Sequence, residues 1–286
     1  MTDVSVIITA LDEPYLDRTI EDIIEKSGPE LKEIIVVDDF SKEQIKNSNA
    51  KVYRNSSRKG LIWGRNFAAD KAKSEVIVSV DPHVKIISDD WLDPLLKKLE
   101  SNSKCIAYPK TYCLDPETWV EFNIEVPGYR TTWNWMLDFK WIKGVGETNE
   151  SPAVAGHCFS FKKEWWDKCG RFDNNMTGWG GENIDFSLRT WLFGGSVEYV
   201  DCWVAHWFKK EFQYKVYPEK LLMNKSRIAE SLFGDYKQNF YKAINRLPGS
   251  IDFGDIRDRI RVRIRNQERS FSWFLQKFKD VMPLIR

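Results

Sequence analysis

Asp81 and His83 are the residues of this chain best suited to bind a metal ion. They stand two positions apart in Asp81-Pro82-His83, directly after a short apolar, β-branched run. A carboxylate and an imidazole at a strand end can point into the same crevice, where they would hold Mn²⁺ or Mg²⁺ against a nucleotide diphosphate. The imidazole favours Mn²⁺, and the cation would offset the charge that grows on a diphosphate leaving group. The alternative is a strand-end aspartate that caps the next element.

The chain has two further histidines, and each has two interpretations. His206 follows an expected strand at 196–200 and could complete the metal site from across the sheet. Alternatively, it is a core histidine buried among Trp203 and Trp207. His157 lies in Val-Ala-Gly-His, where the plain interpretation is a loop histidine that makes one backbone hydrogen bond.

The segment Trp179-Gly180-Gly181-Glu182-Asn183 has the residue types of a sugar site. The two glycines let the backbone and the Glu182 carboxylate approach a ligand closely at the start of an expected helix, 183–193. Sugar hydroxyls would bond to the carboxylate, and the apolar sugar face would pack on the indole. The alternative is a turn and helix cap, with Trp179 as a core residue.

Strands and helices alternate in the first third of the chain. Short β-branched runs predict buried strands at 4–9, 34–37, 51–54 and 75–80, and apolar residues at helical spacing predict helices at 15–26, 61–73 and 88–100. This order indicates a mostly parallel sheet flanked by helices, which binds ligands beyond the carboxyl ends of its strands. Neither GxGxxG nor GxxxxGK[ST] is present. Residues 109–150 are expected to be loop-rich, and those after 211 mostly helical.

Taken together, these motifs resemble the polypeptide N-acetylgalactosaminyltransferases, which have the GT-A fold. The Asp173–Trp191 segment is similar to that family's donor-sugar motif, with Asp185 where the family usually has Glu. Asp81-Pro82-His83 is similar to its Asp-x-His metal pair, and His206 to its later metal-ligating histidine. Further matches occur in order between about residues 4 and 210: Thr9, 37–41, 58–65, 134–135 and 139–141.

The resemblance implies a specific fold and site. We expect a GT-A (Rossmann-like) α/β catalytic domain at 1–214 and a mainly helical, basic extension of unknown role at 215–286. Asp81, His83 and His206 would hold the metal, and Asp81, Trp179 and Glu182 would take catalytic roles. The expected donor-binding residues are Thr9, Asp38, Asp39, Gly60, Arg65, Gly156, His157, Gly180, Gly181 and Asn183.

Three features depart from the family pattern. Neither a membrane anchor nor a C-terminal lectin domain is visible, so we expect a catalytic domain alone. His157 stands where the family typically has a second Gly after Ala-Gly, near the donor sugar, and therefore bears on donor specificity. Pro82 replaces a small residue between the metal ligands, which stiffens the pair.

The resemblance implies a retaining glycosyltransferase that uses Mn²⁺ and a UDP-sugar. The donor would carry a hexose or an N-acetylhexosamine, and the resemblance favours N-acetylgalactosamine (GalNAc). Inverting relatives of this fold usually carry a carboxylate base after the Gly pair, whereas this chain has the amide of Asn183. We therefore expect front-face attack, with the departing β-phosphate taking the acceptor's proton.

The sequence leaves several classes of acceptor open. The resemblance favours a Ser/Thr hydroxyl of a polypeptide, and a glycan is the other main candidate. The row of arginines in 257–269 adds a third, a hydroxymethylated base in DNA, because such a row can track phosphates. Residues 257–286 carry nine basic and three acidic side chains. This row could equally be a solvated face, or a helix that pairs with the acidic remainder of the chain. A protein that binds a UDP-sugar without catalysis is a separate alternative, although it would not need all three metal ligands.

Composition limits the class of protein. The net charge of +1 argues against a polycation that coats nucleic acid. The five cysteines are spread singly with no CxxC pair, which favours reduced thiols. No apolar run approaches the length of a membrane span, and no signal peptide is evident. We therefore expect a cytoplasmic protein without an integral membrane segment.

Overall fold

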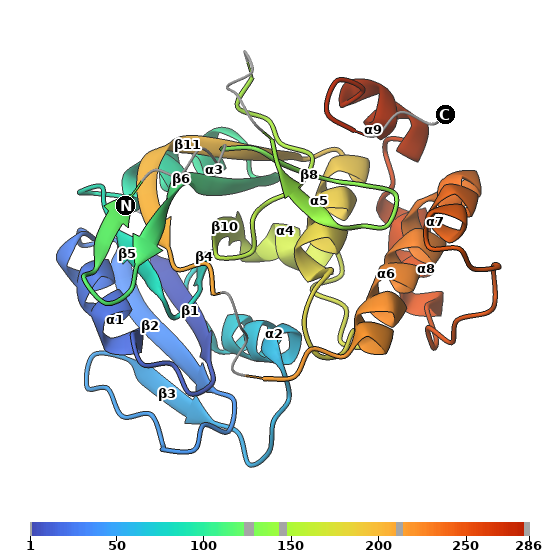
Figure 1. Cartoon of the computed structure of the whole chain (residues 1–286). Helices are drawn as coiled ribbons and strands as arrows, with labels where there is room; N and C mark the ends of the chain where they lie inside the picture. The colour runs from blue at the N-terminus through green and yellow to red at the C-terminus, as the bar shows by residue number, and fades with distance from the viewer. Residues whose placement is uncertain (1, 123–128, 143–147, 210–213, 283–286) are drawn as a thin grey trace.

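The central element is a mixed β-sheet with helices on both faces (Figure 1). The computed structural model describes residues 2–122, 129–142, 148–209 and 214–282. The strand order is β3-β2-β1-β4-β10-β6-β11-β5, with β7 beside β6, and β8 and β9 form a separate hairpin. The strands are β1 Val4–Ala10, β2 Leu31–Asp38, β3 Lys51–Arg54, β4 Val76–Val80, β5 Val84–Ile86, β6 Cys105–Asp115, β7 Val120–Phe122, β8 Thr131–Trp133, β9 Phe139–Trp141, β10 Cys158–Lys162 and β11 Ser196–His206.

Strand direction explains why one edge of the sheet collects polar residues. β1, β2, β3 and β4 pair in parallel, and so do β6 and β11. β10 is antiparallel to both β4 and β6, so it starts at the edge where β4 ends. Asp81, just after β4, accordingly donates its backbone N–H to the carbonyl of His157, just before β10, at 2.7 Å. The carboxyl ends of β1, β4 and β11 therefore meet at one edge.

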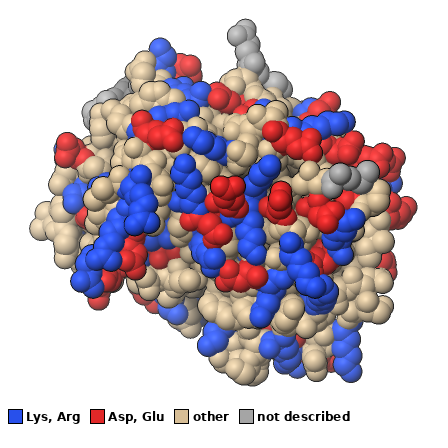
Figure 2. Space-filling view, turned by 180° about the vertical axis from the view of Figure 1, so that it is seen from behind, with Lys and Arg blue, Asp and Glu red and all other residues tan. Residues whose placement is uncertain are grey.

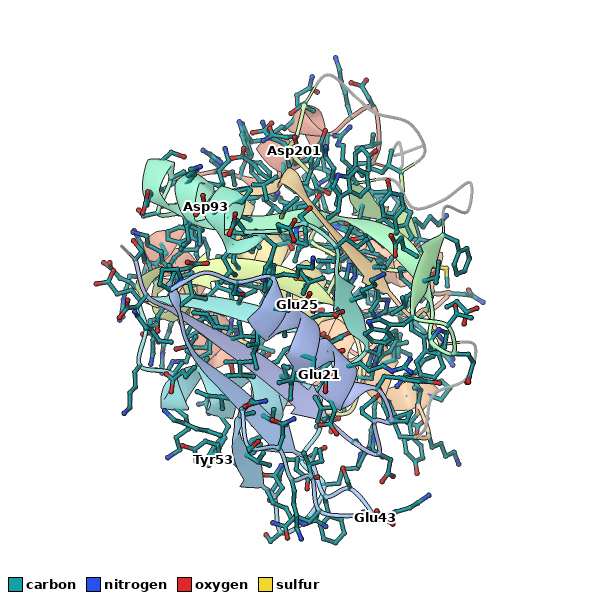
Figure 3. All side chains as sticks on the ribbon, turned by 90° about the vertical axis from the view of Figure 1, so that its left-hand side faces the viewer. Glu21, Glu25, Glu43, Tyr53, Asp93 and Asp201 are labelled. Atoms are coloured by element: carbon teal, nitrogen blue, oxygen red, sulfur yellow. The ribbon has the colours of Figure 1, made fainter. Side chains whose placement is uncertain are left out.

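Each face of the sheet is covered by its own helices and its own hydrophobic cluster. In β1, Ile7 belongs to one cluster while Val6 and Ile8 belong to the other, as the alternation of a strand requires. Helices α1 and α3 cover the face that bears Val6 and Ile8. Glu21, Glu25 and Asp93 lie on the outer side of these helices (Figure 3). The helices are α1 Leu16–Glu25, α2 Leu61–Lys71, α3 Leu92–Ser101, α4 Lys163–Lys168, α5 Glu182–Leu192, α6 Pro218–Leu232, α7 Lys237–Ala243, α8 Arg257–Asn266 and α9 Phe271–Lys277, with a short 3-10 helix at Gly234–Tyr236.

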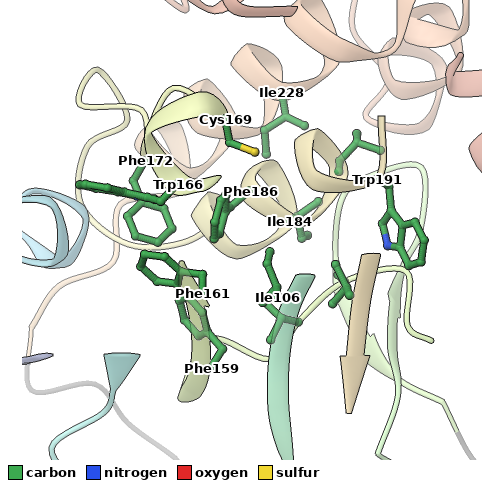
Figure 4. Packing of buried hydrophobic residues seen from close by; sticks show 14 of the residues in the cluster. Ile106, Phe159, Phe161, Trp166, Cys169, Phe172, Ile184, Phe186, Trp191 and Ile228 are labelled. Carbon is green, nitrogen blue, oxygen red and sulfur yellow. The ribbon is translucent and has the colours of Figure 1, made fainter. Parts of the chain in front are cut away.

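Aromatic packing holds α5 against the sheet. Phe186 of α5 meets Phe161 of β10 with ring centroids 5.4 Å apart, and Phe172 with 5.3 Å (Figure 4). Phe186 and Phe161 are fully buried. Because interiors are close-packed, this cluster fixes the first turn of α5, where Glu182, the residue expected to bind the sugar, lies.

The C-terminal helices belong to the same hydrophobic cluster as α2, α4 and α5. Trp133 of β8 stacks on Phe233 at the end of α6, with centroids 5.5 Å apart, and on Phe274 of α9, at 6.0 Å. All three side chains are fully buried. The mainly helical C-terminal part expected from the sequence is therefore confirmed, and it packs directly on the sheet-containing part.

Some element boundaries differ from those expected. The helix expected from residue 88 begins at Leu92, the strand expected at 196–200 continues to His206, and the loop-rich stretch 109–150 contains most of β6 together with β7, β8 and β9. None of the described helices is long and apolar enough to cross a membrane. The expected loop-rich stretch and the expected helical part also include residues 123–128, 143–147 and 210–213, which lie outside the described residues.

The arginines of α8 differ in burial and in their partners. Arg259 is buried and donates to the carbonyls of Gly170 and Arg171. Arg257 pairs with Asp255, and Arg261 with Asp258. Figure 2 shows basic and acidic side chains interspersed over the rear face of the molecule. This arrangement fits the interpretation in which the arginines pair with the protein itself and gives DNA binding no support.

Candidate active site

A cleft of about 520 Å³ opens at the sheet edge where β1, β4 and β11 end. Most residues expected from the sequence to form the site line it. These are Thr9, Asp39, Gly60, Arg65, Asp81, His83, Gly156, His157, Trp179, Gly180, Gly181, Glu182, Asn183 and His206. Residues remote in the sequence, including Leu137 and Asp138 before β9 and Leu221 and Lys225 of α6, complete the lining.

Asp81, His83 and His206 come together as one cluster, the metal group, as the sequence predicts. One potential ligand atom from each lies within 4.8 Å of the others, and Asp81 Oδ2 is 3.5 Å from His206 Nε2. His206 ends β11, where it pairs with Val84 of β5, and this pairing brings it beside His83. The two imidazole centroids are 4.9 Å apart.

The donor set fits a divalent cation. His206 is 9% exposed, and neither of its ring nitrogens has a hydrogen-bond partner among the described residues. Burial lowers the pKa of His206 to about 4, although Asp81 beside it acts in the opposite direction. Burial would raise the pKa of Asp81, but His206 and Arg65 hold it below its ordinary value. At neutral pH the site therefore offers a neutral imidazole and a carboxylate, which are the forms that bind Mn²⁺.

Glu13 supports this group without belonging to it. Its Oε2 is 3.1 Å from His83 Nδ1, and its Oε1 accepts from Lys209 Nζ at 2.5 Å. Burial would raise the pKa of Glu13, but His83 and Lys209 hold it below its ordinary value. A carboxylate bonded to one ring nitrogen orients a metal-ligating histidine and leaves the other nitrogen for the ion. In the sequence, Glu13 is one of two adjacent acidic residues, Asp12-Glu13, that follow β1.

Arg65 connects the metal group with Glu182, the residue expected to bind the sugar. The side chain is 3% exposed; its Nη1 donates to Glu182 Oε1 at 2.9 Å, and its Nη2 donates to Asp81 Oδ1 at 3.0 Å. Nη2 also donates to the Gly156 carbonyl. Arg65 therefore bridges two acidic groups of the cleft, and the nucleotide contact expected for it stays a prediction.

Glu182 is the first residue of α5 and keeps one oxygen available. It is 4% exposed, and its Oε2 has no hydrogen-bond partner among the described residues. Gly180 and Gly181 both have positive φ, of 96° and 97°, so they turn the chain sharply into the helix. Trp179 is 36% exposed at the cleft, so it is not a core residue.

Asp38 and Asp39 have different roles although they are adjacent. Asp39 lines the cleft and accepts from Asn55 and from the backbone N–H groups of Lys59 and Gly60, at 2.7–2.8 Å, so it holds the loop before α2. Among the described residues that line the cleft, Asp38 is absent. Its fully buried carboxylate instead accepts from Ser41, Ile45 and Arg54. The structure therefore corrects the donor-binding role expected for Asp38, because its oxygens are used inside the loop that follows β2.

Thr9 lines the cleft with a buried hydroxyl that has no hydrogen-bond partner in the described part of the chain. Gly64 allows this position, since a Cβ there would lie 2.6 Å from Thr9 Cγ2. A free donor–acceptor group at the end of β1 suits the nucleotide contact expected for Thr9.

His157 is buried against the metal group. Its Nε2 is 2.8 Å from Thr111 Oγ1, and its ring stacks on His206 with centroids 4.6 Å apart. Burial and then the neighbouring His206 place the pKa of His157 well below its ordinary value. The partner of Nε2 is a side chain rather than the backbone group expected. Asn183, by contrast, donates its amide to the Val154 carbonyl at 2.8 Å and so secures the chain before β10.

Comparison with known proteins agrees with this architecture. The model of glycosyl transferase family 2 matches residues 5–170, more than half of the chain. The chain belongs to glycosyl transferase family 2. A second model, described as the N-terminal domain of galactosyltransferase, matches residues 141–213.

Curated relatives of this family 2 member are N-acetylgalactosaminyltransferases. The chain is 33% identical to the probable N-acetylgalactosaminyltransferase 6 of Caenorhabditis elegans, over 96% of this chain and 50% of the relative. It is also 33% identical to human polypeptide N-acetylgalactosaminyltransferase 14, over 95% of this chain and 53% of the relative. The chain therefore spans about half the length of these relatives.

A solved structure confirms the GT-A fold. The crystal structure of GalNAc-T7 with UDP, GalNAc and Mn²⁺ matches with a TM-score of 0.88 and 26% identity, over 98% of this chain and 57% of that one. The likeness expected for residues 4–210 thus continues through the C-terminal helices.

Proposed function

We propose that this chain is a retaining glycosyltransferase that moves GalNAc from UDP-GalNAc to a Ser/Thr hydroxyl of a polypeptide. The observation that carries the proposal is the arrangement around Arg65, which joins Glu182 to Asp81 of the metal group. Glu182 Oε2 has no hydrogen-bond partner in the described part of the chain. The relatives named above support GalNAc as the sugar and polypeptide as the acceptor. Another hexose or N-acetylhexosamine, and a glycan acceptor, are the alternatives that the experiments below distinguish.

The cation would be held by Asp81, His83 and His206. Mn²⁺ fits this mixed oxygen and nitrogen donor set better than Mg²⁺, which prefers oxygen. When bound, it would supply positive charge to the diphosphate of the donor. The GalNAc-T7 structure, with UDP and Mn²⁺, supports the choice of metal.

The side chains of the cleft would position the donor. Glu182 Oε2 would accept from a sugar hydroxyl, and the exposed Trp179 would pack on the apolar face of the sugar. Thr9 and the loop held by Asp39 would contact the nucleotide. Orientation of this kind supplies much of the acceleration in group transfer.

Front-face attack fits the absence of a carboxylate at position 183. The acceptor oxygen would form its bond to the anomeric carbon on the face from which UDP departs, as the bond from that carbon to the β-phosphate oxygen breaks. The acceptor proton would pass to the departing β-phosphate oxygen, so no protein base is needed. Asn183 donates its amide to the Val154 carbonyl and would serve to hold the chain before β10. The α-configuration of the donor would be kept.

The first test measures UDP release by the purified chain with Mn²⁺ and a panel of UDP-sugars. We expect release with UDP-GalNAc, and a loss of at least about 100-fold in Asp81→Ala, in His206→Ala and in chelator. Asp93→Ala, an exposed carboxylate on α3, is the matched control and should behave like the wild type. Full activity of either metal-site variant in chelator would refute the metal assignment, and donor binding without any UDP release would favour a non-catalytic binder.

The second test identifies the product. Peptides with Ser or Thr and free oligosaccharides are offered as acceptors, and the glycoside is examined by NMR. An α-linked GalNAc on the peptide is expected. A β-linkage would exclude retention, and transfer to oligosaccharides alone would change the acceptor class.

A further inference from the structure

Helix α6 lies directly on the loop that precedes Glu182. A Cβ on Gly180 would lie 2.8 Å from Leu221 Cδ1, and one on Gly181 would lie 3.4 Å from Ile228 Cδ1. Leu221, Asn224 and Ile228 follow one another at helical spacing on a single face of α6. The C-terminal part of the chain thus touches the backbone of the expected sugar loop.

Asn224 bonds this loop at two points. Its Oδ1 accepts from the Thr177 N–H at 3.0 Å, and its Nδ2 donates to the carbonyls of Thr177, at 3.1 Å, and Gly180, at 2.9 Å. Asn224 is fully buried. An asparagine in the interior of a helix is unfavourable for the helix itself, so its value here lies in the bonds that it makes to the loop.

The loop needs such a support. Gly178, Gly180 and Gly181 all have positive φ, a conformation that glycine adopts readily but does not hold by itself. One turn further along α6, the buried guanidinium of Arg227 donates to both carboxylate oxygens of Asp173, at 2.7 and 3.1 Å. Helix α6 therefore secures this segment at its beginning, Asp173, and at its end, Gly180.

We propose that α6 sets the conformation of the sugar-binding loop and that Asn224 is a positioning residue for the donor sugar. This inference rests on the function proposed above, and it gives the C-terminal part a role in the reaction. Asn224 would act through the backbone of 177–180, which places Trp179 and the first turn of α5. Among the described residues, the side-chain hydrogen bonds of Asn224 go to the backbone of Thr177 and Gly180. None goes to β1, the loop after β2 or the metal group, which would form the uridine and diphosphate side of the cleft.

The test compares Asn224→Ala and Asn224→Asp with the wild-type chain. Asn224→Asp keeps the shape but replaces the Nδ2 donor by an oxygen facing two carbonyls. We expect both variants to lower kcat/KM for the UDP-sugar by about 10- to 100-fold, as misplacement of a reacting group does. Affinity for UDP with Mn²⁺, measured by calorimetry, should stay within about twofold of wild type.

Ser231→Ala is the matched control. Ser231 is also buried on α6, but its hydroxyl donates to the carbonyl of Arg227 within the helix and does not touch the loop. It should leave kcat/KM within about twofold of wild type. If Asn224 were important only for folding, UDP affinity and UDP-sugar turnover would fall together, and that result would overturn the proposal. Unchanged turnover in both Asn224 variants would overturn it as well.

Hydrogen–deuterium exchange separates this inference from the proposed function. Peptides that cover 174–181 should exchange faster in Asn224→Ala than in the wild type or in Ser231→Ala, because the Thr177 N–H loses its acceptor. This readout needs no substrate. If the wild type shows no turnover with any UDP-sugar, the proposed function fails while exchange still decides whether Asn224 supports the loop. Unchanged exchange would remove the support on which the inference depends.

Discussion

At the scale of one residue, Glu13 contacts His83, one of the three candidate metal ligands, and so would extend the proposed metal site beyond those ligands. Its loss would leave the Nδ1 side of His83 without its orienting carboxylate. We expect Glu13→Ala to weaken Mn²⁺ affinity by about 10- to 100-fold. Glu13→Gln should recover part of it, since the amide oxygen can accept the same hydrogen bond. Mn²⁺ titration in the presence of UDP, followed by electron paramagnetic resonance, measures the effect. Glu21→Ala, on the exposed side of α1, is the control, and equal affinity in all four proteins would exclude the role.

Asp38 gives a prediction about stability rather than catalysis. Burial would raise its pKa, but hydrogen bonds from Ser41, Ile45 and Arg54 lower it below the ordinary value of 3.8. The unfolded chain therefore binds a proton at this position before the folded one does, so the contribution is complete above about pH 4 and is lost as the pH falls further. We expect Asp38→Asn to cost about 2 kcal/mol at pH 7. Urea unfolding should show the difference from wild type shrinking below pH 4, and a constant difference would contradict this explanation.

Asp38 and its neighbour Asp39 show where prediction from single residues ends. Motif and spacing predicted the three candidate metal ligands, which the structure brings together, and the Trp179–Asn183 segment, which lines the same cleft, because these residue types combine in few ways. They could not separate Asp38 from Asp39, since consecutive residues at a strand end point in different directions, and the strand's exit decides which one meets the cleft. Glu13 and Asn224 were not assigned roles because their partners are 70 and 44–47 residues away in the sequence.

At the scale of elements, two glycines of the cleft should respond differently to the same substitution. Gly180 has a φ of 96°, and a Cβ there would meet Leu221 Cδ1 at 2.8 Å. Gly156 has ordinary φ, and its nearest neighbours would lie at 3.8 Å. We therefore expect Gly180→Ala to cost at least about 1–2 kcal/mol and to raise the KM for the donor, while Gly156→Ala keeps wild-type stability. Thermal unfolding and donor kinetics check both, and equal losses would show that φ and space do not decide the outcome.

Elements with short apolar runs were predicted well, and irregular ones were not. β1, β2 and β4 lie where their β-branched runs indicated, because a strand buried on both faces needs such a run. β3 also forms where it was expected, but it is an exposed to half-buried strand at the end of the sheet. β11 was expected to end at residue 200. The strand register shifts between Val200 and Trp203, and this irregularity interrupts the alternation that identifies a strand. The order β4-β10-β6 depends on pairing between distant segments, which no local pattern records.

At the scale of the whole molecule, the division at residue 214 separates two parts that share one core. Phe233, Phe271 and Phe274 of the C-terminal part cover Trp133 of β8. Removing one buried Phe costs about 3–5 kcal/mol, whereas a domain is stable by only about 5–15 kcal/mol in total. A fragment of residues 1–214 should therefore lose its fixed tertiary structure. We expect weak near-ultraviolet circular dichroism, strong binding of a hydrophobic dye and no cooperative urea transition. Phe274→Ala in the full chain should fold but unfold at lower urea. A fragment that unfolds cooperatively and binds UDP with Mn²⁺ would show instead that residues 215–286 are an appendage.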